Sequence, residues 1–167
     1  VFNGGIAIGA EGVTTSSATY AIGQNGGLVN AGGYNTFAGS LNLGGVGAVS
    51  SDAGMLSIFS IAAGNNNLTL GGVGNGMVSG SISMGTGNSV TKSGTGLWVL
   101  SGTNTYTGAT AVSAGILNLQ GGFANKPYVL IGTVSSGVVT VSAGATTQLQ
   151  GGTTFARQFA LSGTGAL

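Results

Sequence analysis

Short strand-like runs that end in a glycine pair recur along this sequence. There are four of these runs: Leu41–Gly45, Leu68–Gly72, Leu117–Gly122 and Gln148–Gly152. The last leucine before each pair moves from Leu43 to Leu70, Leu119 and Leu149, in successive steps of 27, 49 and 30. Self-similarity at such a period is the signature of repeat architectures, in which each unit packs mainly on its neighbours. The recurrence predicts an array of units of roughly 20 to 30 residues.

Two further repeats support a unit of this length. The triplet Ser-Ala-Gly at 113–115 returns at 142–144, a step of 29. The tetrapeptide Ser-Gly-Thr-Gly at 93–96 returns at 162–165, a step of 69, which is three times 23. The middle step between the glycine pairs, 49, then corresponds to two shorter units.

Local patterns favour strands and disfavour helices. No segment sustains an apolar helical period free of glycine, whereas short alternating or β-branched runs are frequent. Strands are expected at 41–43, 68–70, 81–84, 97–100, 116–119 and 138–141. The predicted fold class is therefore all-β.

Strands and repeats together predict a right-handed parallel β-helix, or β-solenoid, of six to eight coils. Each coil carries two or three short strands, and each strand pairs with its equivalent in the next coil. Leu, Val and Ile are expected to stack inward as columns, while Thr, Ser and Asn form uncharged hydrogen-bonded rows outside. Gly and Asn at the corners supply the positive φ of tight turns.

Composition narrows the possible partners. Only 3% of the residues are charged, against about a quarter in typical domains, while 42% are hydrophobic. The low charge is consistent with stacked coils, because like charges in successive coils would repel. A net charge of +1 gives no electrostatic reason to expect nucleic acid or anionic lipid. Every apolar run is shorter than the roughly 18 residues that a transmembrane helix needs, so none is predicted.

Catalytic and metal-binding patterns are weak. The chain has no His and no Cys, and its two carboxylates, Glu11 and Asp52, lie far apart in the sequence. The run Gly71–Gly76 begins like a calcium-binding β-roll motif, but Gly76 stands where the liganding Asp belongs, and 44–49 fails in the same way. We therefore expect no enzyme, no cofactor, and no catalytic, cofactor-binding or metal residue.

The remaining candidate residues have structural interpretations that we prefer. Trp98 and Tyr106 could form an exposed carbohydrate platform, but a strand filler and a turn anchor are favoured. Thr103, Thr105 and Thr107 resemble one rung of an ice-binding row, which would have to recur on successive coils. The three cationic residues, Lys92, Lys126 and Arg157, are expected to be solvated loop residues.

One segment carries a family resemblance. Residues 92–108 read KSGTGLWVLSGTNTYTG and continue as ATAVSAGILNL to Leu119. This stretch closely resembles the autotransporter-associated β-strand repeat, in which an Asn-Thr-Tyr-x-Gly element lies between two strands. Residues 34–39 and 161–167 look like partial copies. The resemblance implies a parallel β-helix and export to the bacterial surface or beyond, and it implies hardly any activity.

These observations predict one β-solenoid segment over 1–167, with its clearest repeat at 92–120, as part of a longer precursor. We expect a non-enzymatic extracellular structural protein that assembles end to end into a filament or surface layer. The expected partners are copies of itself, with cell-surface or matrix components as further candidates. The alternative is an autotransporter-type adhesin passenger or stalk that binds host or neighbouring-cell surfaces.

Overall fold

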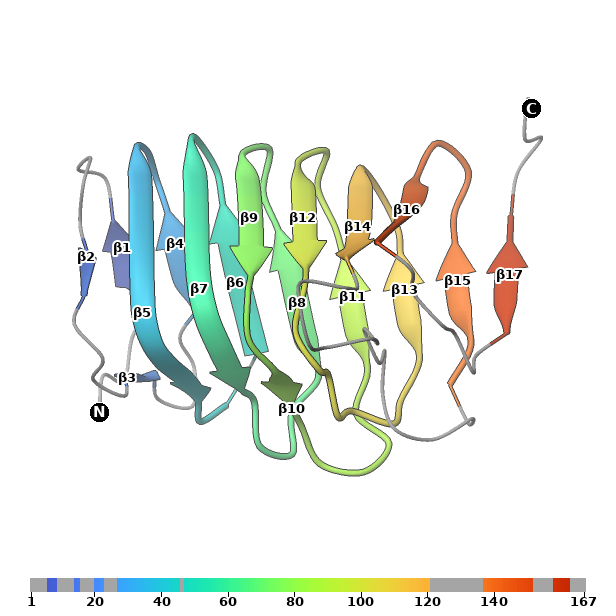
Figure 1. Ribbon diagram of the computed structural model, residues 1–167, viewed down its shortest axis with the longest axis horizontal. Helices are drawn as coiled ribbons and strands as arrows, with labels where there is room; N and C mark the ends of the chain where they lie inside the picture. Colours follow the sequence, from blue (N-terminus) through green and yellow to red (C-terminus); the bar gives the residue numbers. More distant parts are fainter. Residues whose placement is uncertain are drawn as a thin grey trace.

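The computed structural model describes residues 6–8, 14–15, 20–22, 27–45, 47–120, 137–151 and 158–162, with the first three ranges described as backbone strands only. Over these residues the protein consists of strands and turns, with no helix. The strands lie side by side along one axis, from β1 and β2 at one end to β17 at the other (Figure 1). The predicted all-β class is confirmed.

The strands form two parallel sheets. Sheet I contains β1 (Ile6–Ile8), β4 (Leu28–Asn30), β6 (Gly47–Ser51), β8 (Leu68–Gly71), β11 (Val90–Lys92), β13 (Thr110–Val112), β15 (Val139–Val141) and β17 (Phe159–Leu161). Sheet II contains β2 (Thr14–Thr15), β3 (Tyr20–Ile22), β5 (Tyr34–Leu43), β7 (Met55–Ala62), β9 (Asn75–Val78), β10 (Ile82–Ser83), β12 (Leu97–Leu100), β14 (Ile116–Gln120) and β16 (Thr146–Gln150). Each of the six expected strands overlaps one of these elements.

The chain winds from one sheet to the other and back, so neighbours within a sheet are one turn apart in sequence. In sheet I the pairing runs from Leu28 to Val49 and from Leu68 to Val90, steps of 21 and 22. The step from Thr110 to Val139 is longer, at 29. The predicted unit of roughly 20 to 30 residues is confirmed, and so is the β-solenoid.

The coil count differs slightly from the predicted six to eight. About five turns join β4 to β15 of sheet I, and β1 and β17 pair as further strands at the two ends. At both ends the connections between strands fall partly outside the described residues. The hand of the coil stays a prediction.

Only some of the repeats found in the sequence occupy equivalent positions in successive coils of the structure. Lys92 pairs with Val112, Val112 with Val141, and Val141 with Leu161, in steps of 20, 29 and 20. Together these three turns span 69 residues, which is the step between the two copies of Ser-Gly-Thr-Gly at 93–96 and 162–165. Leu119 and Leu149 are also paired. By contrast, Leu43 lies in sheet II and Leu70 in sheet I, so the first step between glycine pairs does not join equivalent positions.

Stacked aliphatic side chains fill the interior, as predicted. One inward column of sheet II contains Phe37, Ile58, Val78, Leu100 and Leu119, all of them buried. In sheet I the corresponding buried column contains Leu28, Val49, Leu70, Lys92, Val112 and Val141. Along β6, β11 and β12, buried inward positions alternate with half-buried outward ones, which keeps the columns aligned from coil to coil.

Glycines close the turn from sheet I to sheet II. Gly33, Gly54, Gly72, Gly94, Gly115 and Gly144 all have positive φ at this corner. At Gly54 a Cβ atom would lie 2.1 Å from the carbonyl oxygen of Gly33 in the coil before. Only glycine therefore fits here, both for its φ of 69° and for the close stacking of the turns.

Candidate assembly surface

Hydrogen bonds between uncharged side chains connect successive coils at outward positions, as expected. The hydroxyls of Ser40 and Ser60 lie 2.6 Å apart. Nearer the other end, Asn118 Nδ2 donates to Gln148 Oε1 at 2.9 Å, and Gln120 Nε2 donates to Gln150 Oε1 at 3.2 Å. Both of these hydrogen bonds between side-chain amides run from β14 to β16, and in both the donor belongs to the earlier coil. They form two rungs of a ladder along the outside of sheet II.

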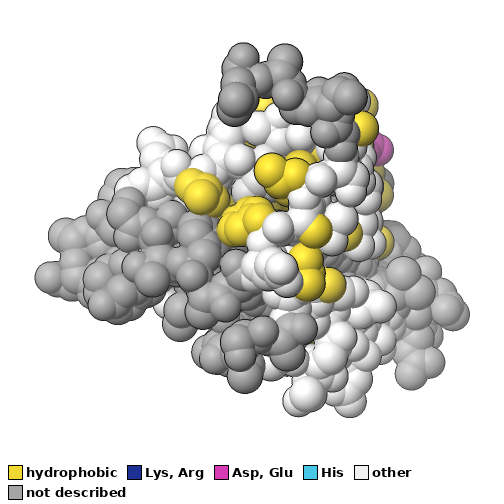
Figure 2. Space-filling view, turned by 90° about the vertical axis from the view of Figure 1, so that its right-hand side faces the viewer, with side chains coloured by type: hydrophobic (Ala, Val, Ile, Leu, Met, Phe, Trp, Pro, Cys, Tyr) yellow, Lys and Arg dark blue, Asp and Glu magenta, His cyan; other side chains and the backbone are white. Residues whose placement is uncertain are grey.

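This ladder reaches the last described strand of sheet II. Among the described strands, β16 pairs with β14 alone and β17 pairs with β15 alone. Large apolar side chains are exposed on both strands: Leu149 is 52% exposed and Leu161 is 77% exposed. Viewed along the solenoid from this end, hydrophobic side chains gather among uncharged ones (Figure 2). These two strands, with Leu149, Leu161, Gln148 and Gln150, are called the terminal surface below.

Few titratable groups lie in the described part of the chain. Asp52 is exposed, and its carboxylate accepts a hydrogen bond from the Ser50 hydroxyl. The described residues contain no group of three or more His, Cys, Asp or Glu side chains that could hold a metal ion. No helix among them is long and apolar enough to cross a membrane. Glu11, Lys126 and Arg157 lie outside the described side chains.

The expectation that Lys92 is a solvated loop residue was wrong. Lys92 ends β11 and points inward, and its side chain is fully buried. Its ammonium group donates to the carbonyl oxygens of Ser93 and Gly94 at 2.8 Å and of Ala114 at 3.1 Å. Burial lowers the pKa of Lys92 below its usual value of 10.5. The inward alternation of β11, with Val90 also buried, was the signal that could have revealed this.

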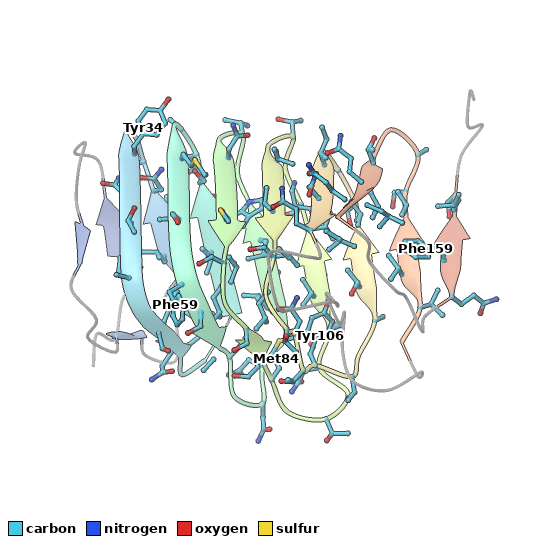
Figure 3. The ribbon with its side chains drawn as sticks, viewed as in Figure 1. Tyr34, Phe59, Met84, Tyr106 and Phe159 are labelled. Atoms are coloured by element: carbon cyan, nitrogen blue, oxygen red, sulfur yellow. The ribbon has the colours of Figure 1, made fainter. Side chains whose placement is uncertain are left out.

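Trp98 and Tyr106 are buried, so the structural interpretation of both is confirmed. Trp98 Nε1 donates to the carbonyl oxygen of Gly71 at 2.9 Å. Tyr106 lies in the lower part of the solenoid (Figure 3), and its hydroxyl is 2.7 Å from Thr110 Oγ1. Among the side chains that the structure describes, the exposed aromatic ones are Tyr34, at 69%, and Phe59, at 54%. Phe59 was not predicted from the sequence to be exposed. The only signal was the alternation of inward and outward residues along β7, which places Phe59 outward between Ile58 and Ser60.

The calcium-like run has a structural role at a corner. Gly72 has a φ of 97° in the turn after β8. Gly76 lies buried in β9, where a Cβ would be 2.5 Å from ring atoms of Trp98. The glycine at the position of the liganding Asp is therefore required by packing. The other run, 44–49, includes a residue outside the described set.

The threonine rung does not extend into a row in the described structure. Thr103 and Thr105 are exposed between β12 and β13, and Thr107 Oγ1 accepts a hydrogen bond from the Gly87 N–H. The outward positions of sheet I provide a different series, in which Thr69, Thr91 and Thr140 are interrupted by Ala111. Neither set is a continuous threonine face over the described coils.

Comparison with known proteins supports the resemblance at the most regular coils. Residues 90–119 match the family described as Passenger-associated-transport-repeat. No curated protein and no solved structure matches the chain. The matched residues begin at β11 and extend through β12 and β13 into β14, which is one full turn and part of the next. A repeat of this kind implies a surface or secreted protein of the autotransporter type. Over the described residues the chain is thus a β-solenoid in which residues 90–119 match a passenger-associated-transport repeat, a combination that fits the passenger of an autotransporter.

Proposed function

We propose that this chain is a non-enzymatic structural solenoid outside the cell, which adds copies of itself end to end to form a filament or surface layer. The observation that carries this proposal is the terminal surface. There, two parallel strands pair on one side only within the described structure and expose Leu149 and Leu161. A strand edge that has no partner among the described strands, at the exposed end of an apolar column, is a template for another strand, whether from a further coil of the same chain or from a second copy.

The uncharged side chains of the terminal surface support the stacking of a further copy of the chain on it. Its described side chains carry no charge, so the usual repulsion against edge-to-edge pairing is missing. Gln148 and Gln150 accept hydrogen bonds from the coil before through Oε1. Their Nε2 groups offer the same amide chemistry to a further coil, so one more coil with polar outward residues continues the ladder.

A second candidate function is a passenger stalk or adhesin that binds host or neighbouring-cell surfaces. The match to a passenger-associated repeat supports it, as do the exposed rings of Tyr34 and Phe59. Tyr34 projects at the upper corner of the solenoid and Phe59 lies in its lower half (Figure 3). Loss of cell-surface binding in Tyr34→Ala or Phe59→Ala, with the fold intact, supports this candidate.

Electron microscopy of the native material, with diffraction from aligned samples, separates the two. Long unbranched fibres with a meridional repeat of about 4.8 Å support end-to-end assembly, because this is the spacing of hydrogen-bonded strands. Discrete short rods, one per chain, contradict it and leave the stalk or adhesin as the better account.

A further inference from the structure

Lys92 interrupts an otherwise apolar column inside the solenoid. The inward column of sheet I contains Leu28, Val49 and Leu70 before it, and Val112 and Val141 after it. All of these residues are buried, and Lys92 is 0% exposed. A charged side chain is almost never buried without partners. Its position in the column therefore needs a physical reason.

The partners of the ammonium group come from two successive coils. Ser93 and Gly94 follow Lys92 directly in the turn before β12, whereas Ala114 lies in the equivalent turn of the next coil. An ammonium group has three N–H donors, and three carbonyl oxygens accept them. The site is therefore complete only when the turn that contains Ala114 is stacked directly on the turn that contains Gly94.

Aliphatic columns do not specify this alignment alone. A slip of one residue would turn every side chain to the opposite face, so burial excludes it. A slip of two residues keeps the inward and outward faces. In β13 it exchanges Val112 for Thr110, which is also β-branched and buried. The inward column of sheet I alone thus discriminates weakly against two-residue slips, although the close contact of Gly115 with the turn of Gly94 also opposes them.

We infer that Lys92 is a register clasp that selects the alignment of β13 on β11. In the native register its ammonium group reaches the carbonyl of Ala114 in the coil above. After a slip of two residues that carbonyl is displaced along the strand by about 7 Å, beyond hydrogen-bonding reach. The buried ammonium group would then keep Ser93 and Gly94 but lose its acceptor in the next coil, and this disfavours the slipped state. The clasp confers specificity of pairing rather than stability, which is a known use of buried polar groups.

The absence of cysteine from the chain allows a direct test with introduced pairs. Thr91 and Ala111 are register partners on the half-buried outer face. Their Cα atoms lie at strand spacing, about 5 Å, which suits a disulfide. Thr91 and Ser113 lie diagonally, about 8 Å apart, which does not. The pair Thr91→Cys with Ala111→Cys reports the native register, and Thr91→Cys with Ser113→Cys reports a two-residue slip.

Each of the two cysteine pairs is introduced into three versions of the full chain. The first has no further change, the second carries Lys92→Met, and the third carries Leu70→Met as the matched control. Leu70 precedes Lys92 in the same column and also becomes Met, but it has no polar role. The proteins are refolded and oxidised, and the crosslinked fraction is measured by peptide mapping. Circular dichroism checks that each variant folds.

We expect Lys92→Met to fold, because Met fills the column and water can reach the part-buried carbonyls. The slipped crosslink should rise at least about tenfold in Lys92→Met, and should not rise in Leu70→Met. An equal and low slipped fraction in the two variants overturns the inference. Loss of the fold in Lys92→Met also overturns it, because Lys92 would then be needed for stability rather than register.

Discussion

The indole ring of Trp98 lies directly over the backbone of Gly76, its register partner in the coil before. Both residues are buried, and a Cβ at position 76 would lie 2.5 Å from two ring carbon atoms. The largest side chain of the interior is thus accommodated by the absence of a side chain in the neighbouring coil. The indole N–H also bonds to the Gly71 carbonyl, which fixes the ring in this position.

This contact predicts a large effect of Gly76→Ala. The added methyl group cannot coexist with the ring, so the free energy of unfolding should fall by about 1–3 kcal/mol, as for other overpacked cores. Denaturant titration measures the change. Gly71→Ala is the matched control, because its Cβ would meet only the Ser93 hydroxyl, at 3.2 Å. Equal losses in the two variants would show that the ring is not tightly held.

The buried hydroxyl pair of Tyr106 and Thr110 gives a second prediction. Tyr106→Phe leaves the Thr110 hydroxyl without this partner and should reduce the unfolding free energy by about 1 kcal/mol. Adding Thr110→Val removes both polar groups with little change of shape, so the double variant should recover part of the loss. A double-mutant cycle from thermal unfolding checks this. Strict additivity of the two losses would argue against a direct hydrogen bond.

Lys92 predicts the pH dependence of stability. Burial lowers the pKa of its ammonium group in the folded state below the value of 10.5 that applies when unfolded. Between these two pKa values the unfolded chain binds more protons, so the free energy of unfolding rises with pH. The slope is at most about 1.4 kcal/mol per pH unit for one proton. The rise ends above the unfolded pKa.

The measurement for this prediction is a difference between two proteins. Wild type and Lys92→Met are unfolded in urea at several alkaline pH values, so that contributions from other titrating groups are common to both. The wild type should gain stability relative to Lys92→Met as pH rises towards 10.5. A difference that is constant with pH would mean that the three hydrogen bonds to carbonyl oxygens balance the desolvation of the ammonium group. A difference that falls with pH would mean that they outweigh it.

The terminal surface predicts where a charge blocks assembly. Leu161→Asp places a carboxylate on the edge strand β17, where stacking would bury it against the next copy. Val73→Asp is the matched control, because Val73 is similarly exposed, at 70% against 77%, but lies in the turn between β8 and β9 in the middle of the solenoid. Sedimentation and electron microscopy should show shorter or no fibres with Leu161→Asp alone. Unchanged fibres with Leu161→Asp would place the contact elsewhere.

Local pattern was enough to predict most of the architecture. Strand position depends on short alternating runs and glycine punctuation, so the strands around Trp98 and Leu117 could be located without a structure. The return of the tetrapeptide at Ser93 was recognised as three turns because corner sequences must recur where turns stack. The family resemblance came from the same coil. These are properties that a few neighbouring residues determine.

The path of the chain through three dimensions decided the rest. The runs ending at Leu43 and Leu70 look alike, yet they lie in different sheets, because both sheets use the same alternation. Lys92 was expected in solvent, since charge usually favours water; only the stacked turns bring the carbonyl of Ala114, in the next coil, within reach of its ammonium group. The sequence by itself determined which residues form strands and turns. The tertiary structure alone decided which turns meet, because contacts between coils join residues that are a full turn apart.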